Sequence, residues 1–281
     1  MQVGVGLPAT VPGTDGGLIP AWARAADQGP FSALGVLDRV VYDNFEPMLA
    51  LAAAAAVTER ILLATTIVIA PVRPPVLLAK QAATIQALSA GRLVLGVGLG
   101  ARPDDYEATG ASYSTRGRRL TDMLVEMREV WEDGAIGPHV HRPILLAGGA
   151  GGLAASRMAR YADGYVHNGG PPRAFARAAS EALASWEDFA RPGRPQLWGM
   201  SYFQLGGDPE SGRAYLRDYY SFTGPFADRI AAGLLTTPAE IEEHLAGYAE
   251  ARCDHLILYP AVAAIDQLDR LTQVIAAGVP A

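Results

Sequence analysis

Four glycines within five positions form the segment of this sequence best suited to binding a ligand. Gly148, Gly149, Gly151 and Gly152, with Ala150 between them, follow an apolar run and precede a helical pattern. Backbone amides in such a loop, with the positive end of the following helix, bind phosphate groups. A tight strand-to-helix connection is the other interpretation, but it needs fewer glycines. We therefore predict a phosphate site, and without a GK[ST] sequence it is not a nucleoside-triphosphate loop.

A charged pair, Asp38 and Arg39, ends an otherwise apolar run and is the second candidate for chemistry. The two side chains could face a cofactor or substrate, or they could form an ion pair that fixes the loop. Tyr42 follows and could line the same region. Both interpretations stay open on the sequence alone.

Two adjacent threonines, Thr65 and Thr66, interrupt the apolar segment "ILLATTIVIAP". Threonine is a good strand former, so a purely structural role is possible. Neighbouring strand residues point to opposite faces, and the inward hydroxyl could contact a ligand.

The segment "GVGLGA", with Gly96, Gly98 and Gly100, matches the letters of a dinucleotide-binding fingerprint. That fingerprint requires a helix that starts within the glycines. Here we predict no helical period until about Thr115, so we expect instead that a flat ring or another backbone comes close to these glycines.

Other reactive side chains are weaker candidates for metal binding or catalysis. His139 and His141 could bind a metal, but no carboxylate or cysteine partner lies nearby, and we predict no metal site. Cys253 precedes an apolar run and is expected to be a core residue rather than a nucleophile. His167 ends another such run.

Eight short apolar runs alternate with helical patterns, which is the count of a (β/α)₈ TIM barrel. A doubly wound sheet of six strands would leave two runs unplaced. Catalytic residues of a barrel lie at the carboxyl ends of its strands, where the 148–152 loop, the Asp38–Arg39 pair and His167 fall. The predicted strands are Val3–Leu7, Ala33–Leu37, Ile61–Ile69, Leu93–Gly98, Ile144–Ala147, Gly164–His167, Leu197–Gln204 and His255–Tyr259. The predicted helices are Ile19–Asp27, Pro47–Thr58, Pro75–Leu88, Thr115–Trp131, Leu153–Tyr161, Pro172–Phe189, Pro238–Glu250 and Asp266–Ala277.

Net charge, cysteine count and hydropathy argue against several classes of protein. The net charge of −6 over 281 residues argues against a nucleic-acid partner. One cysteine rules out an internal disulfide framework and fits a reducing compartment. The longest charge-free apolar stretches, 48–57 and 61–72, are too short to span a membrane. We expect one cytoplasmic TIM-barrel domain, 1–281, with no membrane contact.

Residues 47–110 resemble the signature block of the luciferase-like flavin monooxygenases, a superfamily that includes bacterial luciferase and deazaflavin-dependent oxidoreductases. The resemblance continues over nearly the whole chain and also implies a TIM barrel. The matching segments are "TERI", "AKQAATIQALSAGRLVLGVGLG", "DDYEATG", "RGRRLTDMLVEMREVW", "PILLAGG", "ARYADGY", "CDHLILYP" and "DQLDRL".

The resemblance implies that reduced flavin mononucleotide (FMN) or its deazaflavin analogue binds at the barrel mouth. A bulge around Thr65 and Thr66, which in the family often contains a non-prolyl cis peptide, would pack on the ring, beside Gly96 and Gly98. The 148–152 loop would hold the phosphate.

Asp38 matches the family position that closes the second strand, and this pair would be catalytic. Many members carry histidine where this chain has Arg39, and a guanidinium cannot shuttle protons near neutral pH. Arg39 could instead pair with a substrate anion or with the flavin carbonyls. Luciferases use an arginine after the fourth-strand glycines for phosphate; Leu99 stands near that position, and Arg102 follows.

The predicted function is a flavin-dependent monooxygenase that uses reduced FMN and oxygen on a small organic substrate. Deazaflavin-dependent hydride transfer is the first alternative, and a non-catalytic flavin-binding protein is the second. A separate flavin reductase would supply electrons, and a homodimer is possible from the family. The polar candidates for substrate contact are Tyr42, His167, Tyr202 and Tyr259.

Overall fold

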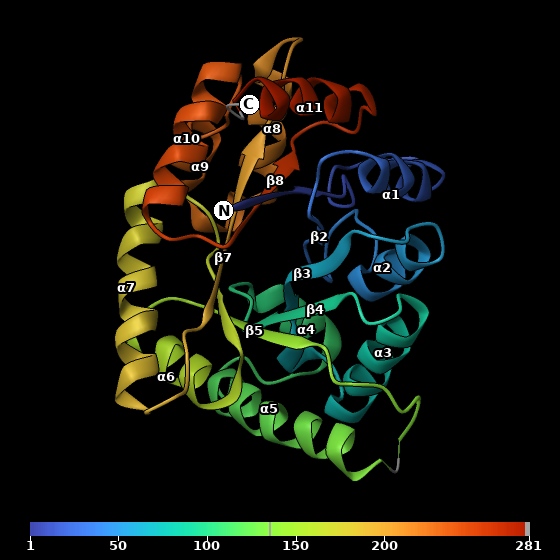
Figure 1. The fold of residues 1–281 in the computed structure, drawn as a ribbon, viewed down its shortest axis with the longest axis vertical. Helices are drawn as coiled ribbons and strands as arrows, with labels where there is room; N and C mark the ends of the chain where they lie inside the picture. The colour runs from blue at the N-terminus through green and yellow to red at the C-terminus, as the bar shows by residue number, and fades with distance from the viewer. Residues whose placement is uncertain (135, 279–281) are drawn as a thin grey trace.

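Eight parallel strands close into a barrel in the computed structural model, which describes residues 1–134 and 136–278 (Figure 1). Each strand pairs with its neighbours in sequence, and β1 closes the barrel against β8. This confirms the predicted (β/α)₈ TIM barrel; residues 135 and 279–281 of the predicted domain lie outside the described residues. The strands are β1 (Gln2–Gly6), β2 (Ala33–Val36), β3 (Leu62–Ile69), β4 (Leu93–Gly98), β5 (Ile144–Gly148), β6 (Gly164–Val166), β7 (Gln196–Phe203) and β8 (His255–Pro260).

Helices cover the outside of the barrel, with α5 along the bottom of Figure 1 and α7 at its left edge. The strands lie between these helices and the barrel interior, which explains why β4 is buried at every position and reads as one apolar run. The helices are α1 (Leu18–Gln28), α2 (Pro47–Ala55), α3 (Pro75–Leu88), α4 (Pro103–Thr109), α5 (Arg116–Asp133), α6 (Gly152–Tyr161), α7 (Pro172–Asp188), α8 (Pro209–Tyr219), α9 (Phe226–Ala232), α10 (Pro238–Glu250) and α11 (Asp266–Gly278), with 3₁₀ turns η1 (Ala70–Val72) and η2 (Ser221–Thr223).

The prediction that no helix begins before about Thr115 is wrong, because α4 starts at Pro103. The helix has only 7 residues, too few to show a period. Its end signals are nevertheless present: proline at the first position, acidic residues in the first turn, and Gly110 in the left-handed conformation after the last turn.

The connection between β7 and β8 carries two helices, α8 and α9, that the sequence prediction also missed. Asp208 caps α8 by accepting a hydrogen bond from the Glu210 amide, and Pro209 is its first residue. This segment brings Tyr215, Tyr219 and Tyr220 to the carboxyl ends of the strands, where they pack against Tyr42 and Tyr202.

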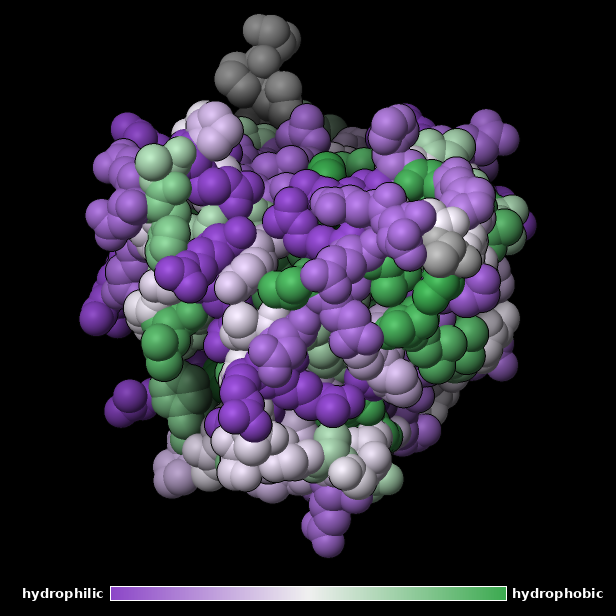
Figure 2. Space-filling view, turned by 90° about the horizontal axis from the view of Figure 1, so that it is seen from below, coloured by the Kyte–Doolittle hydropathy of each residue, from purple (hydrophilic) through white to green (hydrophobic). Residues whose placement is uncertain are grey.

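Among the described helices, none is long and apolar enough to cross a membrane. Hydrophilic side chains cover much of the face seen from below, with separate hydrophobic patches between them (Figure 2).

Candidate functional site

A bulge interrupts β3 where its carboxyl half faces the barrel mouth. The register against β4 shifts between Thr65 and Val68, and the peptide bond from Thr66 to Ile67 is cis. Both features confirm what the family resemblance implied for this strand.

Two positions of β4, Gly96 and Gly98, have no room for a larger residue because the bulge of β3 lies close to them. Thr65 Oγ1 donates to the Gly96 carbonyl at 2.7 Å. A Cβ at Gly96 would collide with the Thr65 carbonyl, and one at Gly98 would lie 2.9 Å from the Ile67 side chain. At Gly96 the close neighbour is backbone, as expected, whereas at Gly98 it is the Ile67 side chain. That a flat ring comes close to these glycines stays a prediction.

The Thr66 hydroxyl lies 2.6 Å from the Tyr259 hydroxyl, which comes from the end of β8. The Tyr259 ring crosses the barrel interior, and a Cβ at either Gly6 or Gly35 would collide with it. Burial raises the pKa of Tyr259, so its hydroxyl stays protonated at neutral pH. Tyr259 therefore fixes the Thr66 side chain beneath the mouth.

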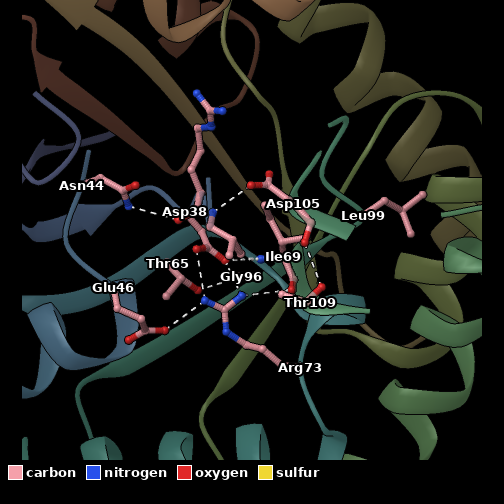
Figure 3. Close-up of polar contacts among 12 residues, drawn as sticks. Asp38, Asn44, Glu46, Thr65, Ile69, Arg73, Gly96, Leu99, Asp105 and Thr109 are labelled. Atoms are coloured by element: carbon pink, nitrogen blue, oxygen red, sulfur yellow. Dashed lines mark hydrogen bonds and ion pairs between the residues drawn. The ribbon is translucent and has the colours of Figure 1, made fainter. Parts of the chain in front are cut away.

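Asp38 is buried and forms its ion pair with Arg73, not with its neighbour Arg39 (Figure 3). Arg73 Nη1 and Nη2 donate to the two Asp38 oxygens at 2.6 and 3.1 Å, and the Ile69 amide donates to Oδ2 at 2.7 Å. Arg73 also contacts Glu46 at 3.0 Å. Burial raises the pKa of Asp38, and the Arg73 guanidinium opposes that shift. The ion pair considered between Asp38 and Arg39 is therefore not formed; Asp38 instead pairs with Arg73 and holds the end of β3 beside η1.

The Arg39 side chain contacts different residues from those that bind Asp38. Its side chain is 5% exposed, donates to the Val41 carbonyl at 2.8 Å, and has its one described ion pair with Asp104 at 3.6 Å. The guanidinium stacks on the Tyr42 ring at 4.4 Å and lies 5.5 Å from the Tyr219 ring centre. Its Nε is buried and has no hydrogen-bond partner among the described residues. The assignment of Asp38 and Arg39 as catalytic stays a prediction.

Three of the predicted substrate residues lie in one tyrosine cluster. Tyr202 pairs its hydroxyl with that of Tyr220 at 2.9 Å and packs its ring 6.0 Å from Tyr259. The Tyr42 hydroxyl donates to Asp218 at 2.6 Å. Sequence reasoning missed the tyrosines of α8, although the cap signal before "YLRDYY" could have revealed them. The cluster consists of Tyr42, Tyr202, Tyr215, Tyr219, Tyr220 and Tyr259.

His167, the fourth predicted substrate residue, has different neighbours. It follows β6 and contacts Phe175 edge-on at 5.8 Å and Tyr165 at 6.2 Å. Burial lowers the pKa of His167, so the ring is neutral at pH 7. Its Nδ1 is buried without a described partner. The structure does not bring His167 together with the tyrosine cluster.

The predicted phosphate loop joins the end of β5 to the first residue of α6. Gly149 and Gly151 have φ values of 142° and 80°, which favour glycine. A Cβ at Gly151 or Gly152 would meet open space, so the loop is accessible. Arg157, further along α6, donates to Thr121 Oγ1 at 3.1 Å, and no ion pair of it is found among the described residues.

The remaining reactive side chains lie away from this region. Cys253 is buried, and burial raises the pKa of its thiol to about 12, as expected for a core residue. Within residues 1–134 and 136–278, no group of three or more histidine, cysteine or acidic side chains is placed to hold a metal ion.

The sequence of this chain is similar to those of known proteins. The sequence model described as luciferase-like monooxygenase matches residues 1–257. An uncharacterised protein of Mycobacterium bovis is 33% identical over 186 residues, covering 53% of this chain and 65% of that protein. An uncharacterised protein of Mycobacterium tuberculosis is 33% identical over 140 residues, covering 44% and 50%. The chain thus spans less than two thirds of the length of these curated relatives.

Solved structures share the fold. An F420-dependent secondary alcohol dehydrogenase with an F420–acetone adduct superimposes with a TM-score of 0.82 at 16% identity, covering 99% of both chains. Monooxygenase RslO1 from Streptomyces bottropensis gives 0.76 at 20% identity, covering 99% of this chain and 98% of the other. The F420-dependent tetrahydromethanopterin reductase from Methanopyrus kandleri gives 0.75 at 14%, covering 99% of both. At these identities the likeness shows the fold alone.

Proposed function

The chain belongs to the luciferase-like monooxygenase family, and from that premise we propose that it binds a reduced flavin-type cofactor at the mouth of its barrel and reduces or oxygenates a small organic substrate. The observation that carries this proposal is the β3 bulge at Thr66–Ile67, built against glycines of β4. Such a surface offers a flat ring an apolar contact, and Ile67 is only half-buried there.

The glycine loop supports a site for the phosphate that FMN and the deazaflavin both carry. Amides at the start of α6 and the positive end of that helix favour an anion. Burial lowers the pKa of Arg157, and no carboxylate within ion-pair distance offsets its charge among the described residues. We propose that residues 148–152 and Arg157 hold the phosphate.

The chain itself would orient the ring, hold a proton and exclude water. Thr66 Oγ1 and Tyr259 Oη share a hydrogen bond beneath the bulge, and the proton between them stays in place because burial raises the pKa of Tyr259. The tyrosine cluster draws its members from β7, from β8 and from the segments that follow β2 and β7, and it would help to exclude water from that part of the mouth. The bound cofactor would supply the redox chemistry, and the protein its setting.

Two forms of the reaction are supported by different observations. The family description supports FMN with oxygen, and that form would need a separate reductase. The likeness to two F420-dependent enzymes supports the deazaflavin form, which transfers a hydride without oxygen. A homodimer remains a proposal from the family resemblance.

Titration of the purified chain with each reduced cofactor, followed by measurement of oxygen uptake, tests these forms. FMN binding with substrate-dependent oxygen uptake would support the monooxygenase. Binding of the deazaflavin alone, with ketone reduction by its reduced form or alcohol oxidation by its oxidised form and no oxygen uptake, would rule the monooxygenase out. Cofactor binding without turnover of any alcohol, aldehyde or ketone tried would favour the non-catalytic flavin carrier. If neither cofactor binds, the proposed function is wrong.

A further inference from the structure

Two arginines and three aromatic rings alternate across the barrel mouth, and we call this set the arginine–aromatic stack. Arg39 lies 4.4 Å from the Tyr42 ring centre and 5.5 Å from that of Tyr219. Arg102 lies 5.6 Å from the Tyr219 ring centre and 4.1 Å from that of Phe222. Each guanidinium is therefore adjacent to two rings, and both share Tyr219.

Three segments that are distant in the sequence supply the stack. Arg39 and Tyr42 follow β2, Arg102 precedes α4, and Tyr219 and Phe222 come from α8 and η2. Arg102 Nη2 donates to the main-chain carbonyl of Tyr219, which holds the α8–η2 segment against the mouth.

The positive charges of the stack are poorly compensated. Arg102 is 6% exposed, and no carboxylate lies within 4.0 Å of it among the described residues. Burial, followed by the charge of Arg39, lowers the pKa of Arg102. The negative charges of Asp104 and Asp105 oppose that shift, but Asp105 lies outside ion-pair distance of both arginines. Its Oδ1 accepts the amides of Val40 and Val41 at 2.9 and 2.8 Å, and its buried Oδ2 has no partner among the described residues.

Arg39 also retains an unused donor. Its nearest carboxylate, Asp104, lies at 3.6 Å and is itself 49% exposed. Its buried Nε–H has no acceptor among the described residues. Burying a donor without a partner is unfavourable, and a ligand oxygen would satisfy it.

We propose that Arg39 and Arg102 form a subsite for the carboxylate of an organic-acid substrate. A carboxylate accepts from a guanidinium fork more strongly than a neutral carbonyl does, so it would replace the Tyr219 carbonyl on Arg102. The rings of Tyr42, Tyr219 and Phe222 favour a planar or aromatic acid beside them. This inference rests on the proposed function only in assigning the anion to the substrate.

Calorimetric titration with benzoate and with benzamide, its neutral counterpart of similar shape, tests the subsite on the full chain. We expect benzoate to bind at least tenfold more tightly than benzamide. The R102Q and R39Q variants should each lose most of that preference, while R102K should keep part of it because it retains the charge. R229Q, which changes an exposed arginine of α9, should bind benzoate as the parent does.

The source of the anion is distinguished by titrating FMN and the deazaflavin into the same variants. Unchanged cofactor affinity in R102Q and R39Q supports a substrate subsite, whereas a tenfold loss in either variant would assign that arginine to the cofactor phosphate and overturn the proposal. Equal binding of benzoate and benzamide by the parent would also overturn it.

Circular dichroism checks that each variant folds. If R39Q does not fold, the comparison of R102Q with the parent still tests the proposal. Because this titration needs no cofactor, it can fail while cofactor binding succeeds.

Discussion

At the scale of single residues, the neighbours Asp38 and Arg39 belong to different networks. Asp38 is fully engaged by Arg73 and the Ile69 amide, whereas Arg39 faces aromatic rings. The sequence could identify both as unusual charges after a strand. It could not identify their partners, because Arg73 lies 35 residues away and is held by the path of η1.

We expect the Asp38→Asn substitution to lower the free energy of unfolding by about 3 kcal/mol, since it leaves the Arg73 guanidinium without its buried counter-charge. Urea denaturation measures this. Asp122→Asn, at an exposed position of α5, is the matched control and should change stability little. An effect of Asp38→Asn as small as the control would contradict the assigned role.

Tyr259→Phe removes only the hydroxyl that fixes Thr66. We expect a loss of stability of about 1 kcal/mol and a fall in kcat larger than any change in KM, because the Thr66 hydroxyl would no longer be held. Thermal melts and steady-state kinetics measure the two effects. Tyr161→Phe, whose hydroxyl has no described hydrogen bond, serves as the control; equal effects of the two substitutions would argue against the Thr66 contact.

At the scale of elements, strand positions were predictable to within one or two residues because buried parallel strands are continuous apolar runs. The short helix α4 and the helices α8 and α9 were not found by periodicity. The sequence signals for α4 and α8 are the residues at their starts, Pro103-Asp104 and Asp208-Pro209. Such signals mark only one turn of a helix and produce no period. The tyrosine cluster was therefore only half predicted, since α8 supplies much of it.

The contact between α10 and β7 predicts a pH effect. His244 packs on Tyr248 and lies 2.6 Å from Ser201 Oγ, and burial lowers the pKa of His244 to about 4 from 6.5. The folded state then binds fewer protons than the unfolded state between these values. This contribution to stability is complete above pH 6.5 and is lost as the pH falls towards 4.

We therefore expect His244→Gln to flatten the fall in unfolding free energy between pH 6.5 and 4, by up to about 3 kcal/mol. Urea denaturation at several pH values measures the slope. The exposed His141 offers the control His141→Gln, which should leave the slope unchanged. Parallel slopes for the parent and His244→Gln would show that His244 does not carry the effect.

Arg157, within α6, gives a prediction about the cofactor. Removing the charge of Arg157 should weaken binding of the cofactor about tenfold, as expected for one charge-assisted hydrogen bond to phosphate. Fluorescence titration of Arg157→Gln measures this. Arg160→Gln on the same helix, where the guanidinium stacks on Phe189, is the control. Unchanged affinity in Arg157→Gln would remove Arg157 from the phosphate site.

At the scale of the whole molecule, strand count and family resemblance both predicted the barrel, and the structure confirms it. What the sequence could not supply is the set of contacts across the mouth. Thr66 and Tyr259 are 193 positions apart, and the arginine–aromatic stack joins three connections between strands. Closure of the barrel creates these contacts, so no local pattern records them.

The central claim is that the β3 bulge, supported by the glycines of β4, forms the floor for a flavin-type ring. The measurement that tests it most directly is an anaerobic equilibrium titration of reduced FMN and reduced deazaflavin into the parent chain, Gly96→Ala and Gly16→Ala. A methyl at Gly96 would collide with Thr65, whereas one at Gly16 would lie 3.9 Å from its nearest neighbour, Phe45. We predict that one cofactor binds the parent and Gly16→Ala with equal affinity, and Gly96→Ala at least tenfold more weakly. Binding of neither cofactor to the parent, or full affinity in a folded Gly96→Ala, would contradict the claim.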